Sequence, residues 1–192
     1  MQEKIILVDK DDNEIGTMEK LEAHKKGLLH RAFSVCIFNT KGEILLQKRA
    51  KHKYHSGGLW TNTCCSHPRP GETIAGAALR RLREEMGILC DLNEIGHLVY
   101  KAPFENGLTE HEYDHILVGF YDKDPVLNPE EAGDFKWVHP DMLRADMKKY
   151  PDRYTYWFKK FMNDPSLAKK IKGNINNNEN DDKKLKKIRA LR

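Results

Sequence analysis

Short apolar runs, each ended by a polar turn, dominate the first fifty residues. Ile5–Val8 predicts a strand, and the polar residues Asp9–Asn13 predict the turn after it. Ala32–Phe38 has the composition of a buried strand. Asn39–Gly42 is typical of a hairpin turn, so Glu43–Arg49 is expected to return as the partner strand.

Helical periodicity is clearest in Thr73–Met86. Leu79, Leu82 and Met86 fall on one face of a helix, and Gly87 is the expected stop. The remaining predicted elements are a helix-like polar segment at Met18–Lys26, strands at His97–Ala102, His115–Tyr121 and Phe135–Val138, and a largely helical stretch at Asp141–Phe161. Because strands and helices do not alternate regularly, the pattern predicts an α+β fold, or a sandwich around a mixed sheet, and not a Rossmann fold.

Length and charge divide the 192 residues into one domain, residues 1–164, and a tail, residues 165–192. The net charge is +4, but the tail holds nine Lys/Arg against three Asp/Glu, or +6, which leaves −2 for the domain. The positive charge therefore gives no reason to expect a nucleic-acid partner.

The tail is basic and rich in asparagine around Asn174–Asn180, so we expect disorder there. Leu185, Ile188 and Leu191 would form one stripe of a basic helix that could touch an anionic membrane. Two turns of apolar surface bind weakly, and a solvated tail is the favoured interpretation. Four irregularly spaced cysteines, no signal peptide and no membrane-spanning run predict a cytoplasmic protein without stable membrane insertion.

Reactive side chains gather in one short segment. Cys65 lies two residues before His67, and the helix that follows ends with the adjacent carboxylates Glu84 and Glu85. A thiol, an imidazole and paired carboxylates in so short a segment indicate a candidate active site.

The same helix resembles a Nudix box, the pattern of glycine, five residues, glutamate, seven residues, then Arg-Glu-apolar-x-Glu-Glu-x-Gly-apolar. The positions that match are Glu72, Arg80, Leu82, Glu84, Glu85, Gly87 and Ile88. Ser66 replaces the first glycine, and Arg81 replaces the glutamate of Arg-Glu. Arg81 removes an acidic metal ligand and adds a cation, which suits holding a diphosphate more than cutting it.

These departures and the segments around them resemble the type I isopentenyl-diphosphate isomerase family over residues 5–160. The resemblance rests on His24, Leu29–Ser34, Gly58–Asn62, Cys65-x-His67-Pro68, Glu110-His111-Glu112 and Tyr154–Trp157. It implies an α/β/α Nudix-like sandwich with a mixed sheet. The implied activity is the interconversion of isopentenyl and dimethylallyl diphosphate through a carbocation.

A metal site is the second implication of this resemblance. The expected ligands are His24, His30, His67, Glu110 and Glu112. Glu110 and Glu112 would point to the same side of a strand, because side chains alternate with a period of two. Nitrogen and oxygen donors suit Zn²⁺, Mn²⁺ or Mg²⁺, and octahedral coordination favours the last two. The other six histidines, His52, His55, His97, His111, His115 and His139, are expected to be ordinary surface or core residues.

Catalytic and substrate-binding roles complete the expectation. Cys65 and Glu112 would form the acid–base pair, Tyr100 would hydrogen-bond the glutamate, and Trp157 would stabilise the cation through its indole face. The expected diphosphate ligands are Lys20, Arg49, Lys53 and Arg81, with Glu85 holding a bridging Mg²⁺.

Two other functions fit parts of the sequence. They are a Nudix hydrolase of a nucleoside diphosphate derivative and a catalytically silent diphosphate-binding module. Arg81 argues against the first, and an intact set of Cys65, Glu112 and metal ligands argues against the second. In each case the partner is a small diphosphate, and we expect a monomer or weak dimer.

Overall fold

The computed structural model describes residues 3–104 and 106–190, in which the chain forms nine strands, five α-helices and one 3₁₀ turn. The strands are β1 (Lys4–Val8), β2 (Glu14–Glu19), β3 (His30–Phe38), β4 (Ile44–Arg49), β5 (Trp60–Thr61), β6 (Cys64–Ser66), β7 (Leu92–Pro103), β8 (Thr109–Phe120) and β9 (Ala132–Val138). The helices are α1 (Lys20–Lys26), α2 (Ile74–Met86), α3 (Pro140–Lys149), the 3₁₀ turn η1 (Pro151–Arg153), α4 (Tyr156–Asn163) and α5 (Pro165–Ala190).

Strand β3 is the centre of a mixed sheet. It runs parallel to β8 and antiparallel to β1, β4 and β6. The sheet continues from β8 to β7, from β4 to β9 and β5, and from β1 to β2. Because β3 contacts so many strands, residues from distant parts of the sequence meet along it.

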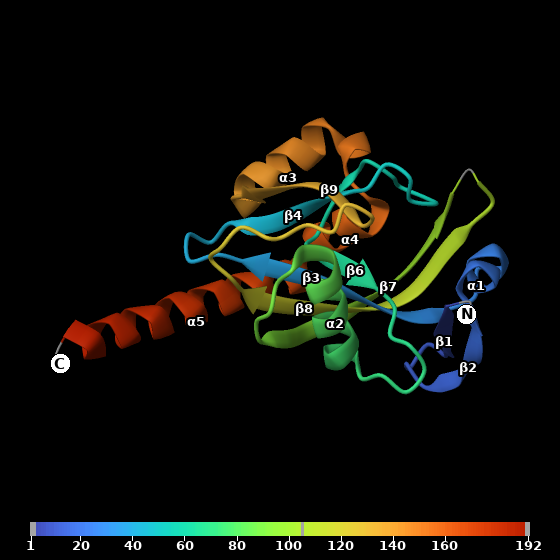
Figure 1. Cartoon of the computed structure of the whole chain (residues 1–192), viewed down its shortest axis with the longest axis horizontal. Coiled ribbons are helices and arrows are strands. Elements are labelled where there is room, and N and C mark those ends of the chain that lie inside the picture. Colours follow the sequence, from blue (N-terminus) through green and yellow to red (C-terminus); the bar gives the residue numbers. More distant parts are fainter. Residues whose placement is uncertain (1–2, 105, 191–192) are drawn as a thin grey trace.

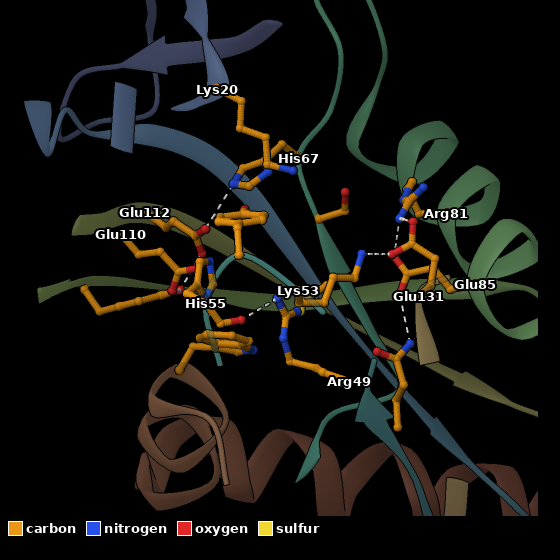
Figure 2. A pocket seen from close by; sticks show the side chains of 16 residues that line it. Lys20, Arg49, Lys53, His55, His67, Arg81, Glu85, Glu110, Glu112 and Glu131 are labelled. Carbon is orange, nitrogen blue, oxygen red and sulfur yellow. Dashed lines mark hydrogen bonds and ion pairs between the residues drawn. The ribbon is translucent and has the colours of Figure 1, made fainter. Parts of the chain in front are cut away.

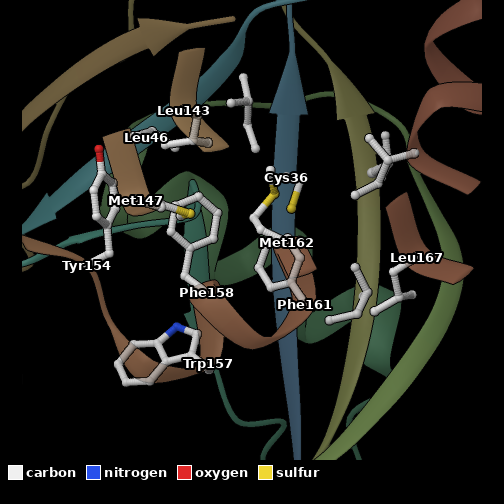
Figure 3. Packing of buried hydrophobic residues seen from close by; sticks show 14 of the residues in the cluster. Cys36, Leu46, Leu143, Met147, Tyr154, Trp157, Phe158, Phe161, Met162 and Leu167 are labelled. Carbon is white, nitrogen blue, oxygen red and sulfur yellow. The ribbon is translucent and has the colours of Figure 1, made fainter. Parts of the chain in front are cut away.

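Helices cover both faces of this sheet (Figure 1). Phe33, Val35 and Ile37 of β3 pack with the buried face of α2. The alternate residues Cys36 and Phe38 pack with α3, α4 and the start of α5, where aromatic side chains fill the core (Figure 3). The period of two along β3 thus builds two cores, and the predicted α+β sandwich with a mixed sheet is confirmed.

Several element bounds differ from those expected. β8 begins at Thr109 and β7 at Leu92, each earlier than the sequence pattern indicated. Met18 lies in a strand and not in a helix. The predicted helical stretch is interrupted after Lys149, because Pro151 disfavours the helical conformation of the residue before it. The short strands β5 and β6 were not predicted.

The segment after residue 164 begins as part of the body. It forms helix α5, and its residues Leu167 and Ile171 are buried in the core beside α4. The packed region thus extends past the expected boundary, and the second half of α5 projects from the sheet (Figure 1). The predicted apolar stripe of Leu185, Ile188 and Leu191 lies outside the residues whose side chains are described. No helix in the described residues is long and apolar enough to cross a membrane.

Candidate active site

Strand register brings the predicted site residues together around β3. In the parallel pairing with β8, His30 lies opposite Glu112. On the other side of β3, Ser34 is paired with Cys65 of β6. Tyr100 of β7 is the antiparallel partner of Glu112. Four strands therefore carry the thiol, the imidazole, the phenol and the carboxylate to neighbouring positions.

Helix α1 adds His24 to this cluster. The helix begins after Glu19, whose carboxylate accepts hydrogen bonds from the N–H groups of Leu21 and Glu22 at 3.1 and 2.8 Å. It ends at Gly27, whose left-handed conformation (φ 60°) favours glycine. These two caps fix a helix of seven residues and hold His24 fully buried against the sheet.

Three imidazoles and a carboxylate converge in this cluster. The donor atoms of His24, His30, His67 and Glu112 all lie within 4.8 Å of one another. His24 Nδ1 lies 2.6 Å from the carbonyl oxygen of Lys20, so it carries the proton, and its Nε2 presents a lone pair. His30 is oriented in the same way by the carbonyl of Leu28 at 2.8 Å. Neither Nε2 has a hydrogen-bond partner among the described residues, which is the geometry of metal ligands.

The protonation states of these groups also suit a metal. Burial and the neighbouring charge of His30 lower the pKa of His24 to about 4. Burial lowers the pKa of His67 to about 3, although its contact with Glu112 opposes the shift. Both imidazoles are therefore neutral at pH 7, as metal coordination requires.

Glu110 and Glu112 share one hydrogen-bond donor and have opposite pKa shifts. The hydroxyl of Tyr100 lies 3.0 Å from Glu110 Oε2 and 2.6 Å from Glu112 Oε2. Burial and the charge of Glu112 raise the pKa of Glu110 to about 8. Burial alone would raise the pKa of Glu112, but contacts with His30 and His67 at 3.7 and 3.0 Å hold it well below its usual range. One carboxyl group thus keeps a proton while the other is ionised.

His55, which the sequence had assigned to the surface or core, lines the same cavity. Its Nε2 lies 3.0 Å from Glu110 Oε1. The donor atoms of His24, His55 and Glu110 form a second group within 4.8 Å of one another. Burial and the charge of Arg49 lower the pKa of His55 to about 3, so it is also neutral at pH 7. No spacing in the sequence relates His55 to the other ligands.

A cavity of about 60 Å³ extends from these carboxylates to the Nudix-box helix α2 (Figure 2). All four predicted diphosphate ligands line it, namely Lys20, Arg49, Lys53 and Arg81. Arg81 pairs with Glu85 at 2.8 Å and with Glu131 at 2.9 Å, and Lys53 also pairs with Glu131. Glu131 was not predicted, and no pattern in the sequence indicates it. It links two cations that a diphosphate would need.

Glu85 lies at the α2 end of the cavity, apart from the histidine cluster (Figure 2). Its Oε2 accepts a hydrogen bond from Gln47 at 2.8 Å, and it is only 4% exposed. Burial would lower the pKa of Arg81, but the charges of Glu85 and Glu131 raise it, so the guanidinium stays charged. The cavity thus has a histidine–glutamate end and a separate arginine–glutamate end.

Cys65 and Trp157 both line the cavity. Burial raises the pKa of the Cys65 thiol, which keeps its proton at neutral pH. Its neighbour Cys64 points the other way into the core behind α2, as the alternation of side chains predicts. The Trp157 ring is 2% exposed, and the guanidinium of Arg49 lies over it, 5.4 Å from the ring centroid.

Comparison with known proteins defines the class first. A family model of the NUDIX domain matches residues 28–158. A crystallised protein from Deinococcus radiodurans shares the fold, with a TM-score of 0.64 and 19% identity over 77% of this chain and 90% of its own. A MutT protein from Methanosarcina mazei Go1 has a TM-score of 0.60 and 18% identity over 76% and 95% of the two chains. This is a NUDIX-domain fold.

Sequence relatives then specify the family. Isopentenyl-diphosphate Delta-isomerase 2 of Photorhabdus laumondii is 53% identical over 163 residues, which cover 85% of this chain and 92% of the relative. Isopentenyl-diphosphate Delta-isomerase 1 of Aromatoleum aromaticum is 55% identical over 82% and 89% of the two chains. The enzyme of the same name from Serratia proteamaculans is 49% identical over 85% and 92%. This chain belongs to the isopentenyl-diphosphate Delta-isomerase family, and the resemblance seen in its motifs is confirmed.

A divalent metal ion fits the histidine–glutamate end. The buried Nε2 atoms of His24 and His30 have lone pairs and no partner in the described part of the chain, and the ionised carboxylate of Glu112 lies beside them. Nitrogen and carboxylate donors without thiolate exclude a purely soft-metal site.

Proposed function

We propose that this chain interconverts isopentenyl diphosphate and dimethylallyl diphosphate, with Cys65 and Glu112 as the proton-transfer pair. The observation that carries the proposal is a single cavity lined by a protonated thiol, a carboxylate held by Tyr100, and four cations. The close sequence relatives carry the name of this activity.

The reaction needs one proton supplied and one removed. A proton added to the terminal methylene carbon of isopentenyl diphosphate takes the π electrons into a new C–H bond and leaves positive charge on the tertiary carbon. Loss of a proton from the methylene group on the diphosphate side returns an electron pair to the carbon skeleton as the new double bond. Cys65 and Glu112 each change protonation state once, and the reverse reaction restores both.

The carbocation needs a dry cavity with electron density but no nucleophile. We assign this role to Trp157, whose indole is almost completely buried at the cavity wall. Cation–π attraction is worth about 2 kcal/mol when the ring is desolvated. Arg49 already lies over the indole, so it would fix the ring while its charge faces the diphosphate.

Two metal sites belong to the proposal. Mn²⁺, Mg²⁺ or Zn²⁺ would bind His24, His30, His67, Glu110 and Glu112. When bound, this ion would supply positive charge that keeps both carboxylates ionised. At the other end, Glu85 would hold a Mg²⁺ shared with the diphosphate, because Mg²⁺ prefers a carboxylate together with substrate oxygens.

Substrate binding would reorganise the basic side chains. Lys53 and Arg81 pair with Glu131, so a diphosphate must compete with this carboxylate. The diphosphate carries more charge and more acceptor oxygens than the Glu131 carboxylate, which favours transfer of the two cations to the diphosphate. Lys20, which pairs with Glu3 at 3.1 Å, would close the site from the α1 side.

The setting of the enzyme is the last part of the proposal. We place it in the cytoplasm as a monomer or weak dimer that acts on a small diphosphate without a nucleic-acid partner. The charge of −2 on residues 1–164 supports the absence of a polyanion-binding surface on the domain.

Phosphorus and proton NMR of the purified, Mg²⁺-supplemented protein with isopentenyl diphosphate tests this function. We expect dimethylallyl diphosphate to accumulate to a fixed equilibrium ratio without release of phosphate. Released phosphate would indicate a hydrolase, and unchanged substrate would indicate a binding module. Either result would overturn the proposal.

A further inference from the structure

His55 has the local arrangement of the other metal-directed histidines. Its Nδ1 lies 3.3 Å from the hydroxyl of Ser56, while its Nε2 faces Glu110 Oε1 at 3.0 Å without the alignment of a hydrogen bond. The same division is found in His24 and His30, where Nδ1 is held and Nε2 is left for a ligand. The donor atoms of His55, His24 and Glu110 lie within 4.8 Å of one another.

Aromatic packing holds the His55 ring in place. The ring stacks on Phe104 with centroids 4.6 Å apart and an interplanar angle of 14°. The rings of Tyr54 and Trp157 meet it nearly at right angles, at 4.4 and 5.9 Å. The side chain is only 3% exposed. Because the ring is already fixed in the folded protein, it loses little conformational entropy when it binds a ligand.

The loop that carries His55 is strained in a way that aims this side chain inward. Ser56 adopts a positive φ of 52°, which is uncommon for a residue other than glycine. A side chain at Gly57 would collide with the backbone carbonyl of Lys51, so only glycine permits this close turn. Backbone strain of this kind persists where a fixed geometry is needed.

We propose that His55 is the sixth ligand of the metal ion at the histidine–glutamate end of the cavity. This inference rests on the proposed function, which already assigns five ligands to that ion. Two groups of donor atoms face this ion, and they share His24. The first consists of His24, His30, His67 and Glu112, and the second of His24, His55 and Glu110. Together they supply four imidazole nitrogens and two carboxylates, enough for octahedral coordination once the bound ion draws the two groups together around it.

A complete protein ligand set changes the role of the ion. With six protein ligands, no coordination position is left for water or substrate. The ion then acts by fixing Glu110 and Glu112 and by balancing their two negative charges in a buried site. Substrate contacts are left to the thiol, the tryptophan and the cations.

Electron paramagnetic resonance of the Mn²⁺-loaded protein tests this coordination in the wild type. A water molecule bound to Mn²⁺ broadens the spectral lines when the solvent is enriched in oxygen-17. We expect no broadening in the wild type. In H55A, the vacated position takes up water, so broadening appears, and added imidazole removes it. H52A is the matched control, because His52 is in the same loop but exposed, and it should behave as the wild type.

Metal affinity supplies a second readout. Competition with a chelator should show Mn²⁺ binding weakened about 10- to 100-fold in H55A and unchanged in H52A. Broadening in the wild type would overturn the proposal and leave His55 as a hydrogen-bond partner of Glu110. If H55A does not fold, H55N supplies the same comparison. Because these spectra are recorded without substrate, they are independent of whether the protein proves to be an isomerase.

Discussion

The buried histidines of the metal-free protein should lower its stability when the pH falls from 7 to 5. His24, His55 and His67 are buried, and their pKa values are lowered to about 4, 3 and 3 from an ordinary value of 6.5. In the unfolded chain these imidazoles take up protons below pH 6.5, whereas in the folded protein they remain neutral. A lowered histidine pKa therefore gives stability that is complete above pH 6.5 and is lost as the pH falls.

The size of the loss follows from the pKa differences. Each pKa unit corresponds to about 1.4 kcal/mol, so each histidine lowers the free energy of unfolding by about 2 kcal/mol at pH 5. Glu110 acts in the opposite direction, because its pKa of about 8 exceeds its ordinary value of 4.5. Acidification to pH 5 regains about 3 kcal/mol from this group. For the three histidines and Glu110 together the loss is about 3 kcal/mol. Burial and the charge of Glu112 also raise the pKa of Asp114 well above its usual range, so Asp114 opposes the loss in the same direction as Glu110, and substitution is needed to isolate the histidine contribution.

Urea unfolding of chelator-treated protein at pH 7 and pH 5 measures this loss. In H67N the loss should fall by about 2 kcal/mol, because one buried imidazole is removed. The control H52N replaces an exposed histidine and should leave the loss unchanged. An H67N variant whose stability changes between the two pH values by as much as that of the wild type would refute the reasoning.

Three further predictions concern catalysis and metal binding. C65S and E112Q should each lower turnover about 10²- to 10⁴-fold while the protein stays folded, whereas C90S should be neutral. A near-normal rate in either site variant would disprove its assigned role. W157L should lower kcat about 30-fold, the equivalent of about 2 kcal/mol of lost cation–π stabilisation, and an unchanged kcat would remove Trp157 from the mechanism. Mn²⁺ binding at pH 7 should release about one proton, chiefly from Glu110; titration calorimetry in buffers of different ionisation enthalpy would show this, and a binding heat independent of the buffer would contradict it.

The sequence predicted the fold where a physical requirement left a local trace. The helix of the Nudix box is marked by its apolar face and by Gly87, and the structure has α2 at Ile74–Met86. Strand alternation correctly separated Cys64 from its neighbour Cys65. The bounds of β7 and β8 were placed too late, because the first residues of each strand carry little apolar patterning and are held by pairing with the last residues of the other strand.

His55 and Glu131 show what a single sequence leaves out. His55 reaches the cavity through a strained turn at Ser56 and Gly57, and no periodicity encodes such a turn. Glu131 lies at the end of the loop between β8 and β9. It meets Arg81 and Lys53 because this loop hydrogen-bonds to the end of α2, far away in the sequence. Both contacts depend on how distant segments meet in space, which spacing along the chain does not specify.

The central claim is that one proton enters and another leaves the same substrate carbon skeleton. Incubation of the protein with isopentenyl diphosphate and Mg²⁺ in deuterated water, followed by NMR of the recovered product, tests it directly. The account predicts dimethylallyl diphosphate with deuterium in the methyl group formed by protonation. Product without deuterium in that methyl group, or loss of phosphate in place of isomerisation, would contradict it.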